Sequence, residues 1–189
     1  MPESEQTPSQ TVGPFFGYAL PYERGPEVAA PWHPDAIRLH GTVYDGAGDP
    51  IPDAILEIWH ADADGRVIAE RGSFERNGFT VTGFGRAAVT RAGQYDFSTI
   101  KPGPTRADAA PYILVTVFAR GLTHHLFTRA YFGDETERND RDPFLSRVDP
   151  ARRPTLIAAR DAENSYLFDI RLQGDGETVF LDFETESHG

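Results

Sequence analysis

Cysteine is absent from this sequence of 189 residues, and lysine occurs once, as Lys101. Without cysteine the chain has no disulfide framework, no thiol nucleophile and no thiolate metal site. No run of about 18 apolar residues could form a membrane-spanning helix. The first residues, MPESEQTPSQ, also lack the basic and apolar pattern of a signal peptide. Together these absences predict a soluble protein of the cytoplasm.

Positive charge is also scarce. The sequence has 18 Lys+Arg against 29 Asp+Glu, a formal net charge of -11. A chain with this negative charge repels phosphate backbones and anionic membranes, and no basic patch in the sequence offsets the charge. Neither a nucleic acid nor a membrane is therefore expected as a partner. All of these basic residues except Lys101 are arginines. The planar guanidinium of arginine binds a carboxylate through two parallel hydrogen bonds. For most of these arginines, codon bias is the simpler explanation.

The order of residue types predicts an N-terminal arm over residues 1–35, one domain over 36–183 and a tail over 184–189. Prolines at 8, 14, 21, 26, 31 and 34 prevent regular ladders and long helices in the arm. The same segment carries five aromatic residues, which are too apolar for a solvated linker: Phe15, Phe16, Tyr18, Tyr22 and Trp32. We therefore expect the arm to pack on a partner subunit.

Short apolar or alternating runs separated by Gly, Asp and Pro turns predict a mainly β domain, an antiparallel sandwich or barrel. Helix signals are weak, and the best is a turn or two at 142–148, with Asp142 as N-cap and Pro143 at the first helical position. The expected strands are 36–45, 54–60, 94–100, 112–119, 126–132, 165–172 and 177–183.

Several short patterns look like metal-binding, nucleotide-binding or catalytic motifs, but each lacks a feature that the motif requires. His124 and His125 are adjacent, and neighbours in an extended segment point to opposite faces, so the pair is poorly placed to share a metal ion. The run ADADG at 61–65 lacks the remaining ligands of a calcium loop, so it predicts a hairpin turn. GFGRAA at 83–88 lacks the context of a dinucleotide loop, and no G-x-S-x-G elbow occurs. Spacing alone predicts only an acidic β domain with an aromatic arm.

Longer motifs, in their order along the chain, resemble the intradiol ring-cleavage dioxygenases. These motifs are TPSQTVGPFF (7–16), GTVYDGAGDPIPDAILEIWHADADG (41–65), GFGRAAVTRAGQYDFSTIKPGP (83–104), APYILVTVFARG (110–121), LFTRAYF (126–132) and FDIRLQGDGETVFLDF (168–183). The arm, FARG and LQGDGETVF are similar to the alpha chains of two-chain members that cleave 3,4-dihydroxybenzoate. The resemblance implies a mixed β-sandwich core with few short helices.

The resemblance also implies an assembly of alpha-beta protomers, in which a homologous beta subunit holds a non-haem Fe(III) ion through two tyrosines and two histidines. With O2, that enzyme opens the ring between the two hydroxyls to give 3-carboxy-cis,cis-muconate, a step of aromatic catabolism in the beta-ketoadipate pathway. In this chain, Thr105 stands where a ligand tyrosine follows K-P-G-P. Tyr112 and Leu114 stand in place of H-x-H, and residues 66–82 contain no tyrosine. The resemblance therefore implies no catalytic iron and no catalytic residue in this chain.

By the same resemblance, this chain helps to shape the substrate pocket of the beta subunit. Arg120 would supply positive charge for the substrate carboxylate, while Thr11, Gly13, Pro14 and Phe15 of the arm would line the pocket. A metal-free transthyretin-like carrier or interaction module is the alternative, although it gives the arm no purpose. A self-sufficient catechol dioxygenase is the other alternative, and the replaced ligands argue against it.

Overall fold

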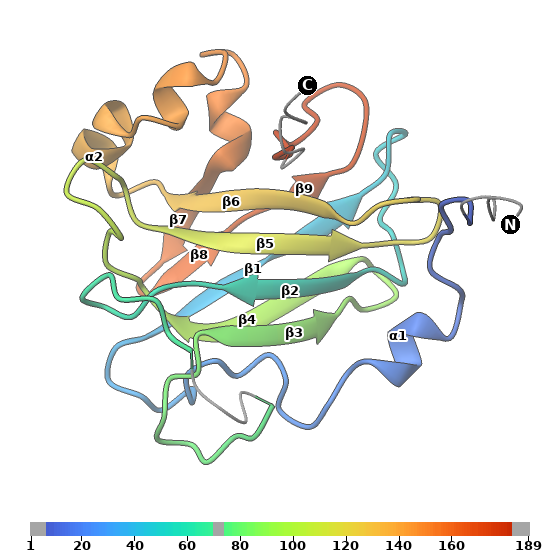
Figure 1. Ribbon diagram of the computed structural model, residues 1–189, viewed down its shortest axis with the longest axis horizontal. Coiled ribbons are helices and arrows are strands. Elements are labelled where there is room, and N and C mark those ends of the chain that lie inside the picture. The colour runs from blue at the N-terminus through green and yellow to red at the C-terminus, as the bar shows by residue number, and fades with distance from the viewer. Residues whose placement is uncertain (1–6, 70–73, 183–189) are drawn as a thin grey trace, which may run out of the picture.

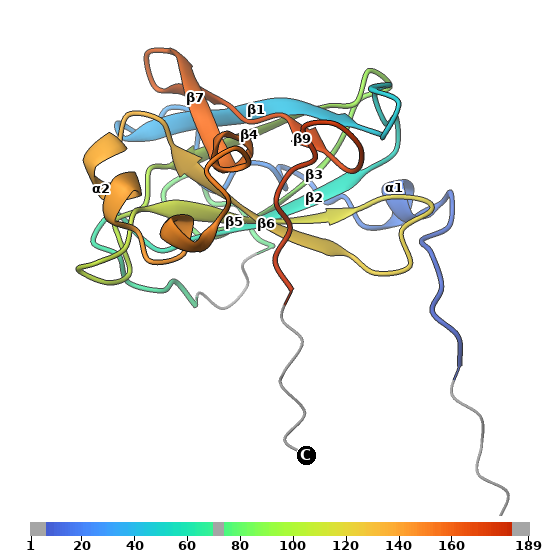
Figure 2. The ribbon, with the colours of Figure 1, turned by 90° about the horizontal axis from the view of Figure 1, so that it is seen from above.

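The computed structural model describes residues 7–69 and 74–182 of the chain. Figure 1 shows β3, β2, β5 and β6 side by side in one layer, and Figure 2 shows β1 and β4 stacked against that layer. The strands are β1 (Ala36–Tyr44), β2 (Ile55–Trp59), β3 (Phe84–Ala88), β4 (Gln94–Ile100), β5 (Tyr112–Phe118), β6 (Leu126–Phe132), β7 (Ile157–Ala162), β8 (Ser165–Leu167) and β9 (Ile170–Arg171).

Hydrogen bonds join the strands in the order β3-β2-β5-β6-β7-β8-β1-β4, with β9 paired to β1. Most pairs are antiparallel, but β1 pairs with β8 and β9 in parallel, and β6 pairs with β7 in parallel. The path begins at β3 and ends at β4, and these two edge strands lie close to each other. The fold is thus a mixed, nearly closed β-sandwich, as the family resemblance implied, whereas the pattern of short runs alone predicted an antiparallel one.

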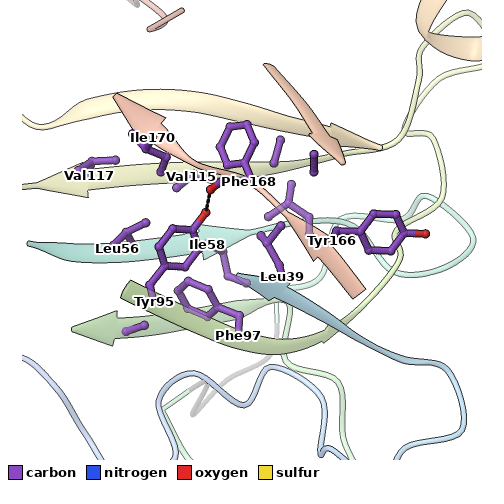
Figure 3. Close-up of a cluster of buried hydrophobic side chains, with 14 of the residues drawn as sticks. Leu39, Leu56, Ile58, Tyr95, Phe97, Val115, Val117, Tyr166, Phe168 and Ile170 are labelled. Carbon is purple, nitrogen blue, oxygen red and sulfur yellow. Dashed lines mark hydrogen bonds between the residues drawn. The ribbon is translucent and has the colours of Figure 1, made fainter. Parts of the chain in front are cut away.

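The core lies between the two layers and is formed by alternate residues of the strands (Figure 3). In β5, Ile113, Val115 and Val117 are completely buried, because successive side chains of a strand point to opposite faces and this set faces inward. Tyr95 lies in the same core, where its hydroxyl donates a hydrogen bond to the carbonyl of Phe168. That bond satisfies a phenol that would be costly to bury alone.

Two of the expected strands differ in the structure. Residues 165–172 form two short strands, β8 and β9, because the chain shifts between them and Phe168 donates its N–H to the carbonyl of His40. Residues 177–182 form no named strand and make only one isolated bridge, between Phe127 and Leu181. Residue 183 lies outside the described part of the chain.

The sequence analysis missed two strands that are poor in β-branched residues. β3 consists of FGRAA, and Gly85 within it leaves the space that Val28 occupies, since a Cβ there would lie 2.5 Å from Val28 Cγ2. β7 consists of IAARDA. Pairing with neighbours overrides weak strand propensity in both cases.

The helices are short: α1 (Phe16–Ala19), α2 (Thr136–Arg141) and the 3-10 turns η1 (Leu145–Arg147) and η2 (Arg153–Leu156). The predicted capping role of Asp142 is confirmed, since its Oδ1 accepts hydrogen bonds from the N–H groups of Phe144 and Leu145, both at 2.9 Å. The helix that follows is a single 3-10 turn, within the expected length, but it begins at Leu145, so Pro143 precedes it and is not at the first helical position. The described residues contain no helix long and apolar enough to cross a membrane.

The ADADG segment forms the predicted hairpin turn. Asp62 Oδ1 accepts hydrogen bonds from the N–H groups of Asp64 and Arg66, and Asp62 N–H donates to the carbonyl of Arg66. Gly65 has φ +83° and lies directly against the K-P-G-P run, because a Cβ there would meet the carbonyl of Pro104 at 2.0 Å. The turn therefore packs on the segment that ends at Thr105.

Candidate functional site

Arg120 lies in the turn after β5, and its side chain remains 55% exposed. Its Nε forms an ion pair with Asp53 Oδ2, a carboxylate in the loop before β2. The sequence analysis did not single out Asp53, because nothing in the spacing links the two loops. The pair orients the guanidinium of Arg120 and offsets part of its charge, so an incoming carboxylate must share the arginine with Asp53.

The arm is tied to the same turn. Thr11 Oγ1 accepts a hydrogen bond of 2.7 Å from the N–H of Gly121, which follows Arg120 and has φ +90°. A positive φ of this size favours glycine. The structure thus brings Thr11 and Arg120, two of the predicted site residues, into neighbouring positions.

The other predicted arm residues are exposed. Phe15 is 78% exposed, and Gly13 and Pro14 are also at the surface. A Cβ built on Gly13 would have no atom of the described chain within 4 Å, and Gly13 has no positive φ. Neither packing within the described chain nor backbone conformation therefore accounts for a glycine at this position.

Next to the Thr11–Gly121 contact the surface holds a hollow of about 230 Å³. Aromatic rings cluster around it: Phe16 of α1 lies 5.5 Å from Phe118, and His125 lies 5.4 Å from Phe118 and 4.7 Å from Phe127, measured between ring centroids. The hollow is lined by Gln10, Val12, Phe16, Phe118, Ala119, Leu122, Thr123, His124 and His125. His124 and His125 thus border one surface hollow.

The former ligand positions lie elsewhere. Thr105 and Tyr112 line a cavity of about 260 Å³ near α2 and η1, whereas Leu114 is half-buried in β5 between Trp59 of β2 and Arg129 of β6. Arg129 reaches this cavity and lies between two rings, with its guanidinium carbon 4.2 Å from the Tyr112 centroid and 4.8 Å from the Phe144 centroid. A cation between two aromatic faces is stabilised by their quadrupoles.

The donor set of this cavity does not fit a ferric ion. Of the former ligand positions, Thr105 offers a neutral hydroxyl, Tyr112 offers one phenol, and Leu114, outside the cavity, offers no donor atom. Burial raises the pKa of the Tyr131 phenol behind them, which favours the protonated form over the phenolate that iron binds. Across residues 7–69 and 74–182, no group of three or more His, Asp or Glu side chains could hold a metal ion.

The Arg120 turn and the former ligand positions occupy opposite ends of β5. Figure 1 shows α1, near the Arg120 turn, at one end of the strand and α2, near the cavity, at the other. Eight residues separate Tyr112 from Arg120, which in an extended strand corresponds to roughly 25 Å. The two sets of site residues therefore cannot act on one small substrate within a single chain.

His60 is a buried histidine directly after β2. Its Nδ1 lies 2.6 Å from the carbonyl of Ala61, so the Nδ1 proton is donated there and Nε2 accepts from the Thr99 hydroxyl at 2.5 Å. Burial lowers the pKa of His60 to about 4. The residue is a neutral structural link between the end of β2 and β4.

Comparison with known proteins identifies the family. A family model described as Dioxygenase matches residues 33–174, which is most of the chain. The chain therefore belongs to the dioxygenase family whose intradiol ring-cleaving members its motifs resemble.

Within this family, the chain is 46% identical to the protocatechuate 3,4-dioxygenase alpha chain of Burkholderia cepacia, over 94% of this chain and 98% of that one. It is 28% identical to the beta chain from the same organism, over 82% of this chain and 65% of that one. Among solved structures, it is similar to the dioxygenase domain of a carbohydrate-binding fusion from Streptomyces sp. SirexAA-E, with a TM-score of 0.61, 25% identity and coverage of 90% and 99%. This relationship sets aside the transthyretin-like carrier.

Proposed function

We propose that this chain is the iron-free half of a protocatechuate 3,4-dioxygenase, which opens 3,4-dihydroxybenzoate with O2 to 3-carboxy-cis,cis-muconate in the cytoplasm. The relationship to alpha chains and, more distantly, to a beta chain supports an alpha-beta complex. In this proposal a homologous beta subunit binds the Fe(III) ion, which supplies activation of the catechol toward O2. The chain described here binds and orients the substrate.

The single observation that carries the proposal is the separation of the two sets of site residues along β5. Arg120 and Thr11 are held together at one end, by contacts within the chain, and face solvent. The former ligand positions at the other end are too distant to use them. An arginine placed in this way is available to a cavity of another chain, and a homologous subunit would carry that cavity at the position that corresponds to Thr105.

The arm supports the same proposal. We propose that residues 1–35 pack on the beta subunit, although residues near Val28 belong to this chain's own core, where Val28 is fully buried. The exposed aromatic side chains of the arm are the part that a partner would cover: Phe15, Tyr18 and Trp32, at 78%, 85% and 66% exposure. Exposed aromatic surface of this kind is typical of interfaces.

At the Arg120 end each residue has a defined task. The guanidinium, oriented by Asp53, offers its remaining N–H groups to the substrate carboxylate, and such charge-assisted bonds select an anion against the negative field of the whole protein. Gly13 admits the substrate ring or a partner residue close to the backbone, and Pro14 stiffens the arm. No proton transfer is assigned to this chain.

Oxygen uptake with 3,4-dihydroxybenzoate tests the proposal, using this chain alone and this chain co-expressed with a beta subunit. Iron content and visible absorbance are recorded for both samples. We expect activity, colour and about one iron per alpha-beta pair only in the co-expressed sample. An active, iron-loaded single chain would refute the division of roles, and a co-expressed complex without activity would refute the assigned reaction.

A further inference from the structure

The cavity at the Thr105 end contains a concentration of arginine that the proposed function does not use. Its lining includes three arginines and one acidic residue; the residues are Thr105, Arg106, Ala109, Tyr112, Arg129, Asp142, Pro143, Phe144 and Arg147. The whole chain has a formal net charge of -11. A cavity whose charged lining residues are three arginines and one aspartate therefore differs in charge from the rest of the molecule.

The acidic residue of the cavity does not neutralise these arginines. Asp142 is buried, and its carboxylate accepts hydrogen bonds from the N–H groups of Ala110, Phe144 and Leu145, each at 2.9 Å, and from the Tyr131 hydroxyl at 3.4 Å. Its four contacts are thus made by backbone and phenol donors. Asp142 shapes the cavity wall rather than pairing with a cation.

The three arginines differ in their partners. Arg106 is paired with Asp108 at 3.1 Å on the exposed rim. Arg129 and Arg147 have no ion pair in the part of the chain that the structure describes. Two guanidinium groups without an ion pair outnumber the one carboxylate of this cavity, which leaves its lining with an excess of positive charge. The neighbouring hollow that Arg129 and Arg147 also border is lined by Asp149, Asp182 and Arg152.

Arg129 is held in place before any ligand arrives. The rings of Tyr112 and Phe144 enclose its guanidinium, and its Nη1 donates a hydrogen bond of 3.1 Å to the Tyr131 hydroxyl. Its Nε is buried and has no acceptor among the described residues. A side chain fixed in this way loses little conformational entropy on binding an anion, which favours affinity.

We propose that this cavity is a metal-free binding site for a small aryl carboxylate, separate from the site to which Arg120 contributes. The carboxylate would bind between Arg129 and Arg147, since a guanidinium pairs with a carboxylate through parallel hydrogen bonds. The ring would lie against the apolar part of the lining, which Ala109 and Pro143 provide. The cavity volume of about 260 Å³ is sufficient for a ligand of one ring.

Equilibrium dialysis of the alpha-beta complex with radiolabelled benzoate tests this site at low ionic strength. We expect two benzoate sites per pair in the wild-type complex. Arg147→Gln, at an exposed position, should weaken one of them at least tenfold without affecting the fold. The matched control Arg91→Gln removes the same charge at an exposed turn outside the cavity and should leave both sites unchanged.

Arg129→Gln should abolish the same site, and near-ultraviolet circular dichroism reports whether that variant keeps its packing. If it does not fold, Arg147→Gln decides the question alone. Equal benzoate binding by the wild-type complex and by Arg147→Gln, whatever the number of sites, would overturn the proposal. Neither readout requires catalytic activity, so failure here is distinguishable from failure of the assigned reaction.

Discussion

Thr11 and Gly121 are joined by a hydrogen bond of 2.7 Å, although 110 residues separate them in the sequence. The Thr11 hydroxyl accepts from the Gly121 N–H, and this contact holds the arm against the turn that carries Arg120. Together with the contact between the rings of Phe16 and Phe118, this hydrogen bond holds the arm against the end of β5.

Replacing Thr11 with Val tests this link. The change keeps the shape of the side chain but removes the acceptor, and a hydrogen bond of this kind contributes about 1 kcal/mol. We expect KM for 3,4-dihydroxybenzoate in the alpha-beta complex to rise about fivefold with kcat little changed, because the change affects how the arm holds the substrate and leaves the chemical step as it was. Thr11→Ser keeps the hydroxyl and should restore KM. Equal KM values for all three proteins would contradict this role.

Arg120 is expected to affect substrate binding through its charge and its shape. Arg120→Ala should raise KM by about ten- to a hundredfold, the range of a lost charge-assisted hydrogen bond. Arg120→Lys keeps the positive charge but lacks the planar guanidinium, so its KM should lie between those of the wild type and Arg120→Ala. Steady-state oxygen uptake measures both variants, with Arg91→Ala as an exposed control; a kcat effect at unchanged KM would instead place Arg120 in the chemical step.

The burial of His60 predicts that the folded chain loses stability in mild acid. Burial lowers its pKa in the folded chain to about 4, while the unfolded value is near 6.5. The unfolded state therefore binds more protons between these values. The contribution is fully present above pH 6.5 and is lost as the pH falls toward 4, by about 3 kcal/mol in total.

Urea unfolding of the complex at pH 7.5 and pH 4.5 measures this effect, and His60→Gln is the comparison. Gln cannot titrate, so the difference between the two pH values should shrink by most of that amount. The variant should be less stable at pH 7.5, because the paired contacts to Ala61 and Thr99 are disturbed. An unchanged pH dependence would show that His60 is not the titrating group.

The contacts of Lys101 predict that its side-chain amine reacts slowly with acylating reagents. Its ammonium lies 3.1 Å from both Asp134 carboxylate oxygens and 2.7 Å from Glu135, and 5.1 Å from the centroid of Phe132. Burial acts to lower its pKa, but the hydrogen bonds to Glu135 and Asp134 outweigh burial and raise it. Protonated amines are poor nucleophiles, so acylation should be slow in the folded complex.

Mass spectrometry of the peptide that contains Lys101 measures that rate. Because Lys101 is the only lysine, it is the only side-chain amine. Asp134→Asn should speed its acylation severalfold by removing one partner, whereas Asp175→Asn, at an exposed loop distant in sequence, should not. Rapid labelling of the wild-type complex would contradict the paired state.

The sequence was sufficient for features that depend on local chemistry. The apolar run at 112–119 predicted strand β5, the ADADG run predicted a turn, and Asp142 predicted a cap, since each depends on neighbouring residues. Strand β3 was missed because its Gly and Ala residues have low strand propensity and pair only through tertiary context.

The candidate site was predictable only in part. The resemblance named Arg120 and Thr11, and the structure shows that they are neighbours. Asp53 and Arg129 were missed, because each acquires its role from contacts between distant segments: an ion pair across two loops and a stack between rings of β5 and the segment before η1. No local pattern in a single sequence encodes such contacts.

The position of β5 has a consequence for which length changes the chain tolerates. β5 pairs along its length with β2 and β6, so its length fixes the distance between the arginine-lined cavity and the Arg120 turn. Inserting two residues would keep every side chain on its face but move one end by about 7 Å. The 45–53 loop, which returns the chain toward β2, is not paired with a strand on each side. Among members of the family, insertions should therefore gather in that loop and avoid β5.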